Sequence, residues 1–317
     1  MLEIVNYLAG FAILASVYAV LALGLNVHWG VTGLMNIGIA GFFALGAYTT
    51  ALLTTPPPDP AKFEQFVFGG NLPGLFQRWG VGGDLWFLAG LAAAALVCAL
   101  VALLIGLVTL RLREEYLAIV TLGIAETIRR VFLNESWLGN GSRGLYQIPK
   151  FLGNLAAPWL YDLLYAGVAL ALLLALFFIV ERTLRSPWGR VLRAIREDEV
   201  TAAASGKNVF RFKLQAFVLG ALIMGIGGGV YAHGFRFIDP FTFDPLLATF
   251  IVWVMLMVGG SGKSAGALLG ALVIWGAWSG SQLLPGYLSN PNLRYLLLGV
   301  AMVLVLLLRP QGLLGRR

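Results

Sequence analysis

Charged residues are scarce in this 317-residue chain. Asp, Glu, Lys and Arg together make up 12% of it, against about 25% in an ordinary soluble domain. Residues 4–58 contain none of the four, and as one helix they would be about 80 Å long, far more than the ~30 Å hydrocarbon core of a bilayer. The run must therefore cross a membrane, turn and cross again. Residues that break its apolar character near the middle are Asn26, His28, Gly30, Thr32 and Gly33.

Cysteine and histidine are equally scarce. The single cysteine, Cys98, lies in an apolar run, so an intramolecular disulfide is impossible and a small buried side chain is expected. The two histidines, His28 and His233, are far apart and lack neighbouring Cys or carboxylate residues at metal-ligand spacing. The sequence therefore predicts no metal site, no bound cofactor and no catalytic centre in this chain.

Seven further charge-poor stretches follow the first run, which predicts an all-α, polytopic transmembrane helix bundle. With two spans before Asp59 they give about nine crossings, or eight to ten if a short stretch is re-entrant. We find no separate soluble region, so residues 1–317 are expected to form a single transmembrane domain. The stretches are 85–110, 116–128, 163–180, 214–235, 245–262, 264–293 and 295–308.

Lys and Arg divide unequally between the two sets of linkers that nine crossings place on opposite sides. Fourteen belong to one set: Arg111, Arg113, the eight within 182–213, Lys263, Arg309, Arg316 and Arg317. Six belong to the other: Lys62, Arg78, Arg143, Lys150, Arg236 and Arg294. Because basic residues concentrate on the cytoplasmic side, the N-terminus is predicted outside and the C-terminus inside. The asymmetry also explains the net charge of +7 without a nucleic-acid partner.

The longest cytoplasmic linker, 181–213, has the pattern of a short amphipathic helix at about 190–208. Ser186-Pro187 is a helix-start signal, and Gly206 can end a helix. Such a helix can dock in a groove of a cytosolic partner, whereas a solvated loop that only sets topology is the alternative. Residues predicted to carry the docking are Arg193, Arg196, Glu197, Asp198, Glu199, Ala202, Ala203 and Gly206.

Two sets of polar or small residues within the spans have open interpretations. Asn36, Gly38 and Gly41 can expose backbone and amide groups to a passing solute, or can serve only for helix packing. Glu126 lies three and four residues before Arg129 and Arg130, so all three share a helix face. Charge inside a membrane suggests function, but a structural ion pair at the outer end of a span fits equally.

The segment 259–264, GGSGKS, resembles a phosphate-binding loop only superficially. That motif needs a glycine at position 257, where Met257 stands, and a strand before it. We therefore expect no ATP site in the chain, and Lys263 is expected to mark the inner end of a hairpin.

Several motifs, in order, resemble the permeases of branched-chain amino acid ABC transporters of the LivM type, almost from end to end. They are GLNVHWGVTGLMNIGIAGFFALGAYTTALL (24–53), LREEYLAIVTLGIAETIRRVFLN (112–134), GSRGLYQIP (141–149), GRVLRAIREDEVTAAASGKNVFRFKLQAFVLGA (189–221) and LLLRPQGLLG (306–315). Importer permeases generally carry Glu-Ala-Ala, three residues and then Gly in the docking loop. Here Val200 and Thr201 follow Glu199, and the alanines stand at 202–204.

The resemblance implies an ABC importer subunit of a bacterial or archaeal cytoplasmic (inner) membrane that translocates leucine, isoleucine and valine. It also implies a second, LivH-like permease, two cytosolic LivG- and LivF-like ATPases that hold ATP and Mg, and an extracytoplasmic solute-binding protein. A permease for urea, short amides or another small polar solute is the alternative within this class. An ion-coupled secondary transporter, the alternative from another class, would need intramembrane carboxylates, for which Glu126 is the one candidate.

Overall fold

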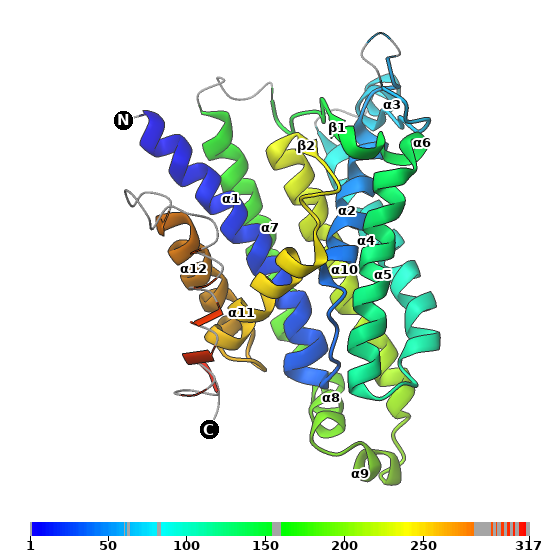
Figure 1. The fold of residues 1–317 in the computed structure, drawn as a ribbon, viewed down its shortest axis with the longest axis vertical. Helices are drawn as coiled ribbons and strands as arrows, with labels where there is room; N and C mark the ends of the chain where they lie inside the picture. The colour runs from blue at the N-terminus through cyan, green and yellow to red at the C-terminus, as the bar shows by residue number, and fades with distance from the viewer. Residues whose placement is uncertain are drawn as a thin grey trace.

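The computed structural model is an elongated bundle of helices with its small elements gathered at two opposite ends (Figure 1). It describes residues 2–59, 61, 64–80, 84–153, 160–281 and 311–314, and positions 293, 296, 299, 300, 303, 304 and 307. The ninth predicted span, near 295–308, therefore lies outside what can be described, apart from single positions in it. The same holds for five of the basic linker residues: Lys62, Arg294, Arg309, Arg316 and Arg317.

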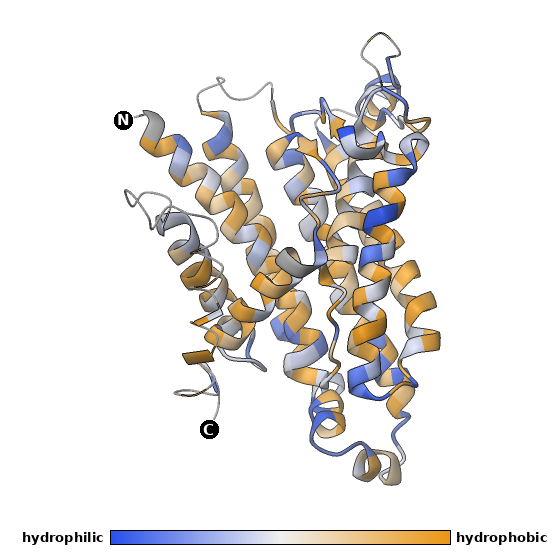
Figure 2. Cartoon of the chain, in the orientation of Figure 1, coloured by the Kyte–Doolittle hydropathy of each residue, from blue (hydrophilic) through white to orange (hydrophobic). Residues whose placement is uncertain are grey.

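Among the described residues, four helices are long and apolar enough to cross a bilayer. They are α1 (Leu2–Leu25) continued by the π-helix η1 (Asn26–Val31), α4 (Leu85–Thr109), α7 (Tyr161–Arg185) and α10 (Val209–Phe235). The helices α1 and α10 are mostly buried within the bundle, whereas α4 and α7 present most of their surface outward. Hydropathy colouring shows apolar residues along the long helices of the bundle (Figure 2). Together they make the chain a multi-pass helical membrane protein.

Two further predicted spans are broken helices. The chain leaves η1, runs without helix through 33–38, and then forms α2 (Ile39–Thr54). Similarly, 239–244 precedes the π-helix η4 (Pro245–Thr249) and the ten-residue α11 (Phe250–Gly259). Sixteen helical residues in α2 cover about 24 Å and ten in α11 about 15 Å. Each helix is therefore too short to cross ~30 Å alone and needs its irregular segment to complete a crossing.

The first broken span packs against the second inside the protein. The backbone N–H of Ala40 donates to Thr249 Oγ1 at 3.2 Å, and the indole N–H of Trp253 donates to the Asn36 carbonyl at 3.2 Å. Non-helical backbone at membrane depth is tolerated only where protein or a cavity satisfies its polar groups. Within 33–38, Trp253 satisfies the Asn36 carbonyl, and the Thr121 hydroxyl accepts from the N–H of Ile37 at 3.0 Å.

A tight turn of Gly260 to Lys263 joins α11 to α12 (Ser264–Gly280), and the two helices are bent by 118° at this break. The turn packs closely against the described part of the C-terminal segment. The N–H groups of Leu313 and Leu314 donate to the carbonyls of Val258 and Gly259, at 2.8 and 3.0 Å. The last carbonyl groups of α11 therefore accept hydrogen bonds from residues more than fifty positions later in the chain.

The helix α5 (Glu114–Asn134) also runs along the bundle, but its charged residues make it more polar than the four long helices. Its apolar side packs against α2, and its other side is exposed. At its C-terminal end lie α6 (Ser136–Gly139), the 3₁₀-helix η3 (Gly141–Arg143) and α3 (Leu72–Arg78). The short strands β1 (Leu145–Tyr146) and β2 (Phe237–Ile238) pair there antiparallel, the only sheet among the described residues.

The opposite end of the bundle holds α8 (Pro187–Glu197) and α9 (Glu199–Ala204) (Figure 1), in a linker rich in basic residues. Of the described Lys and Arg residues in the two linker sets, eleven belong to the set that holds α8 and α9: Arg111, Arg113, Arg182, Arg185, Arg190, Arg193, Arg196, Lys207, Arg211, Lys213 and Lys263. The other set keeps four: Arg78, Arg143, Lys150 and Arg236. The predicted charge asymmetry thus holds in the described part of the chain.

Glycines allow α10 to pass very close to its neighbours. A Cβ atom on Gly46 of α2 would lie 2.1 Å from the Gly225 carbonyl oxygen, and one on Gly228 would lie 2.2 Å from that of Phe43. Backbones can approach this closely only where no side chain intervenes. Glycine at these positions therefore allows the close packing of α2 against α10.

Candidate functional site

The linker 181–213 forms two short helices, where the sequence predicts one helix at about 190–208. Pro187 occupies the first turn of α8, as expected from Ser186-Pro187. Asp198 then adopts an extended conformation (φ −157°, ψ 111°) and separates α8 from α9. The single predicted helix is wrong because Asp198 acts as the N-cap of a second helix.

The cap is made by the carboxylate of Asp198. It accepts bonds from the N–H groups of Val200 and Thr201, at 2.8 and 3.1 Å, and from the Thr201 hydroxyl at 2.7 Å. The Thr201 hydroxyl, together with these two N–H groups, holds the pKa of the Asp198 carboxyl below its usual range. The helix α9 then ends near Gly206 (φ +76°), as predicted, because glycine reaches this conformation without strain.

Side chains of α8 and α9 fix the linker to the bundle. Arg193 donates to the Leu184 carbonyl at 3.3 Å, and Arg196 donates to the Gly30 carbonyl at the end of η1. Glu199 forms an ion pair with Lys213 at the start of α10. Trp188 donates to Gln215 at 2.8 Å. The linker is therefore a packed element attached to α1, α7 and α10.

A groove of about 540 Å³ separates α8 from α9. Ala202 lies in its wall and is buried, whereas Ala203 and Gly206 are exposed beside it. Val200 is 79% exposed, although it is apolar. Of the predicted docking residues, Glu197, Asp198 and Ala202 line the groove, while Arg193 and Arg196 turn toward the bundle instead.

Asn36, a candidate for the translocation path, lies in a buried hydrogen-bond chain. Its side-chain amide lies 3.0 Å from Nδ1 of His28, whose Nε2 lies 2.8 Å from the carbonyl oxygen of Phe217. Because a carbonyl only accepts, Nε2 carries the hydrogen and Nδ1 accepts from Asn36. The Asn36 side-chain oxygen in turn accepts from the N–H of Gly38 at 2.7 Å.

Gly38 and Gly41 serve close packing between α2 and α5. A Cβ atom on Gly38 would lie 2.7 Å from the Thr121 carbonyl oxygen, and one on Gly41 would lie 2.9 Å from Cα of Ala125. The cavity that Gly38 lines measures about 10 Å³, which is about the space of one water. In this conformation no solute the size of an amino acid fits between α2 and α5 there.

Glu126 forms the ion pairs that its spacing predicts. Its carboxylate accepts from Arg129 and Arg130, each at 2.7 Å. The side chains of Glu126, Arg129 and Arg130 are 30%, 13% and 64% exposed. They lie beside an uncovered face of α5 that also holds Tyr116, Ile119 and Leu122. The structure thus separates Glu126 from Asn36, since the first faces outward and the second is buried.

The segment 259–264 lies between two helices, α11 and α12, with no strand before it. The N–H of Gly262 donates to Asn26 Oδ1 at 2.8 Å, so this loop amide is already occupied. No group of three or more His, Cys, Asp or Glu residues that could hold a metal occurs in the described residues.

Sequence reasoning missed two features of this region. The His28–Asn36 pair was not expected because the two residues are joined only through the irregular segment after η1. A basic cavity beside α8 was missed because its lining comes from η1, α7, α8 and the turn before α12. The signal for the cavity was present only as the density of arginines in 181–213.

Comparison with known proteins places this helical membrane protein in a transporter class. A family model described as "Branched-chain amino acid transport system / permease component" matches residues 7–306. The chain belongs to this family.

Individual relatives cover most of its length. It is 32% identical to the high-affinity branched-chain amino acid transport permease LivM of Escherichia coli K12, over 96% of this chain and 69% of the relative. It is 26% identical to the probable LivM of Methanocaldococcus jannaschii, over 95% and 91%. It is also 28% identical to the guanosine ABC transporter permease NupQ of Bacillus subtilis, over 90% and 85%. No solved structure matches the chain.

Proposed function

We propose that this chain is the permease subunit of an ABC importer for leucine, isoleucine and valine. The end-to-end match to the branched-chain amino acid permease family is the observation that carries the proposal. A zwitterionic amino acid cannot cross hydrocarbon unaided, because its charges would lose their hydration. A bundle with buried polar groups and broken helices can provide the route.

The substrate is tested by competition. Cells that carry the whole transporter should take up labelled leucine, and excess isoleucine or valine should suppress that uptake while urea should not. The likeness to NupQ makes guanosine the second candidate. Uptake suppressed by guanosine and unaffected by valine would replace the amino acids with a nucleoside.

We also propose the membrane arrangement: about nine spans in an inner membrane, N-terminus outside and C-terminus inside. The basic end that holds α8 and α9 then faces the cytoplasm, which agrees with the tendency of Lys and Arg to remain there. Residues 1–317 act as one transmembrane domain, in which α2 and α11 cross with the help of their irregular segments.

Energy enters through α8 and α9 in this proposal. The chain uses ATP and Mg held by two cytosolic ATPase subunits and has no ATP site of its own. A packed element transmits displacement, whereas a floppy loop would absorb it. The bonds of Arg193, Arg196 and Glu199 to the bundle support this role. The groove of about 540 Å³ and the exposed Val200 offer the partner a surface.

Crosslinking tests the coupling. A cysteine in place of Ala203, which is exposed beside the groove, should crosslink to an ATPase subunit, whereas a cysteine in place of Gln77 at the opposite end should not. Ala203→Trp should leave the complex in the membrane but separate ATP hydrolysis from uptake. Absence of the crosslink, with normal uptake by Ala203→Trp, would leave the linker as a topology signal.

A second permease subunit is proposed to cover α5. Charged side chains facing lipid at a spanning helix are costly, yet Glu126 and Arg130 lie on its uncovered side. A partner or a water-filled path on that side removes the cost. The extracytoplasmic solute-binding protein then delivers its substrate at the end of the bundle formed by α3, α6, η3, β1 and β2.

A further inference from the structure

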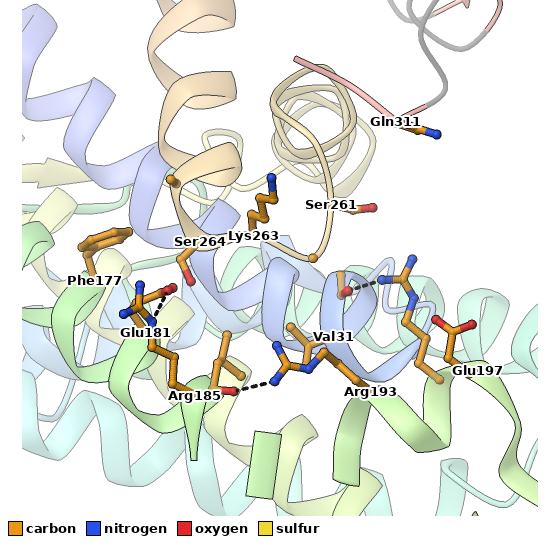
Figure 3. Close-up of a pocket in the computed structure, with 15 residues that line it drawn as sticks. Val31, Phe177, Glu181, Arg185, Arg193, Glu197, Ser261, Lys263, Ser264 and Gln311 are labelled. Atoms are coloured by element: carbon orange, nitrogen blue, oxygen red, sulfur yellow. Dashed lines mark hydrogen bonds and ion pairs between the residues drawn. The ribbon is translucent and has the colours of Figure 1, made fainter. Parts of the chain in front are cut away.

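A cavity of about 990 Å³ opens beside α8 at the basic end of the molecule. Its walls come from the end of η1, the last turns of α7, the inner side of α8 and the turn into α12, with Gln311 from the C-terminal segment (Figure 3). Four basic and two acidic side chains line it: Arg185, Arg193, Arg196, Lys263, Glu181 and Glu197. The lining therefore carries a net positive charge.

Much of that charge is not neutralised by the protein. Arg193 and Arg196 donate to the carbonyls of Leu184 and Gly30, which carry no formal charge. Each guanidinium has five N–H donors, so donors remain on both. Among the described residues, Arg185 is the one basic residue of the lining that has an ion pair with a carboxylate, at 2.9 Å to Glu181. The two arginines of α8 thus keep positive charge beside the cavity.

Ser264 adds an unused hydrogen-bonding group. It is 1% exposed, it lines the cavity, and its hydroxyl has no hydrogen-bond partner among the described residues. Figure 3 shows the hydroxyl pointing inward, on the side of Glu181 and Arg185. A buried hydroxyl without a partner costs free energy, and a bound acceptor would remove that cost.

Ser264 is also the first residue of α12, a helix of 17 residues with no side-chain cap at its N-terminus. The positive end of the helix dipole therefore points to the same place as the hydroxyl. Lys263, directly before it, is exposed and lines the cavity. Hydroxyl, dipole and cations all favour an anion with several oxygen acceptors.

The cavity lies at the level where a lipid headgroup would lie. Glu181 and Arg185 occupy the last turn of the spanning helix α7, where a span reaches the interface. Leu170, Leu174 and Phe178 form an exposed apolar stripe at i, i+4 and i+8 on the preceding turns of α7. A headgroup in the cavity could place its acyl chains along that stripe. Basic pockets between spans on the cytoplasmic side suit anionic headgroups.

We propose that this cavity binds the phosphate of an anionic phospholipid from the inner leaflet. Arg193, Arg196 and Lys263 attract the charge, and Ser264 donates to a phosphate oxygen. The lipid would join α7, α8 and α12, and so would tie the linker helix to the α11–α12 turn. The placement in the inner leaflet rests on the orientation given under the proposed function.

Native mass spectrometry of the purified full transporter tests the site with phosphatidylglycerol and phosphatidylcholine as probes. The wild type should retain phosphatidylglycerol at least tenfold more strongly than phosphatidylcholine. Arg193→Gln/Arg196→Gln should lose that preference. Arg182→Gln/Arg190→Gln removes the same charge at the same end from exposed positions that do not line the cavity, and should stay within twofold of wild type.

A second variant covers the case in which the first fails to assemble. Lys263→Gln/Ser264→Ala leaves the arginine bonds to Leu184 and Gly30 in place and should weaken phosphatidylglycerol retention at least tenfold. Equal loss in the Arg182/Arg190 control would overturn the site. Displacement of the lipid by inorganic phosphate at equal concentration would assign the cavity to a free anion and overturn the lipid.

This outcome is separable from the proposed function. Lipid retention is measured on the purified transporter without transport. Failure of leucine uptake with phosphatidylglycerol still retained would contradict the importer alone. Normal leucine uptake without any lipid preference would contradict the lipid site alone.

Discussion

The side-chain amide of Asn36 donates a 3.0 Å hydrogen bond to Nδ1 of His28, and both residues are fully buried. The pair joins the end of the first span to the irregular segment that precedes α2. Through Nε2 of His28 it extends to α10, and through the Asn36 carbonyl to Trp253 of α11. These buried hydrogen bonds therefore join the first span, the segment before α2, and α10 to α11.

Removal of Asn36 should destabilise the protein. Asn36→Ala leaves Nδ1 of His28 and the N–H of Gly38 without their partner, at a cost of about 1–3 kcal/mol for a buried polar group. Thermal unfolding of the solubilised protein, followed by tryptophan fluorescence, should show a lower midpoint. Thr127→Ala, whose exposed hydroxyl bonds only to its own helix, should leave the midpoint unchanged. An equal midpoint for both variants would contradict the structural role of the pair.

The close contact between α2 and α10 should not tolerate a side chain at position 46. Gly46→Val would bring a side chain into the Gly225 backbone, which lies 2.1 Å from the position of its Cβ. We expect little or no folded protein on size-exclusion chromatography. A Cβ atom on Gly167 of α7 would meet nothing within 4 Å, so Gly167→Val should behave as wild type. Normal recovery of Gly46→Val would mean that the helices do not approach so closely.

The orientation can be read from two cysteines in a Cys98→Ala background. Gln77 and Ser205 are exposed at opposite ends of the bundle. Gln77→Cys should react with a membrane-impermeant maleimide in intact cells, and Ser205→Cys should react only after permeabilisation. Labelling of both from the same side would contradict the proposed threading.

The cap of α9 should protect its amides. Asp198→Ala should speed hydrogen exchange at residues 199–204, while Asp198→Asn should stay near wild type because Asn caps helices about as well as Asp. The lowered pKa of Asp198 adds a pH dependence. Since the folded pKa lies below the ordinary value of about 3.9, the stabilisation is present above that value and is lost as the pH falls through the folded pKa. Protection that falls between pH 7 and 5 would contradict the cap.

The membrane class and the charged end were predictable from the sequence. A run of 55 uncharged residues cannot be accommodated in a soluble core or in one span, and Lys and Arg density marks one side. The limits of the linker helices were likewise predictable: they begin at Ser186-Pro187 and end near Gly206. Each of these residues acts through its own backbone conformation.

The broken helices could not be predicted in the same way. The irregular segment around Asn36 depends on residues distant in the chain for its backbone hydrogen bonds. Trp253 donates to the Asn36 carbonyl, and the Thr121 hydroxyl accepts from the N–H of Ile37. The division of the linker at Asp198 was not predicted. There the Asp198 carboxylate caps a second helix, and these cap bonds replace those that one continuous helix would make. The anion-binding role proposed for Ser264 depends on α7 and α8, which lie more than sixty residues before it.

Transport by the reconstituted importer tests the central claim, that ATPase subunits drive amino acid import through this chain. Proteoliposomes would contain both permeases and both ATPases, with the solute-binding protein added on its own side. The account predicts leucine accumulation that requires ATP and Mg on the α8–α9 side and persists when ion gradients are abolished. Accumulation without ATP, driven by a proton or sodium gradient, would contradict it and favour a secondary transporter.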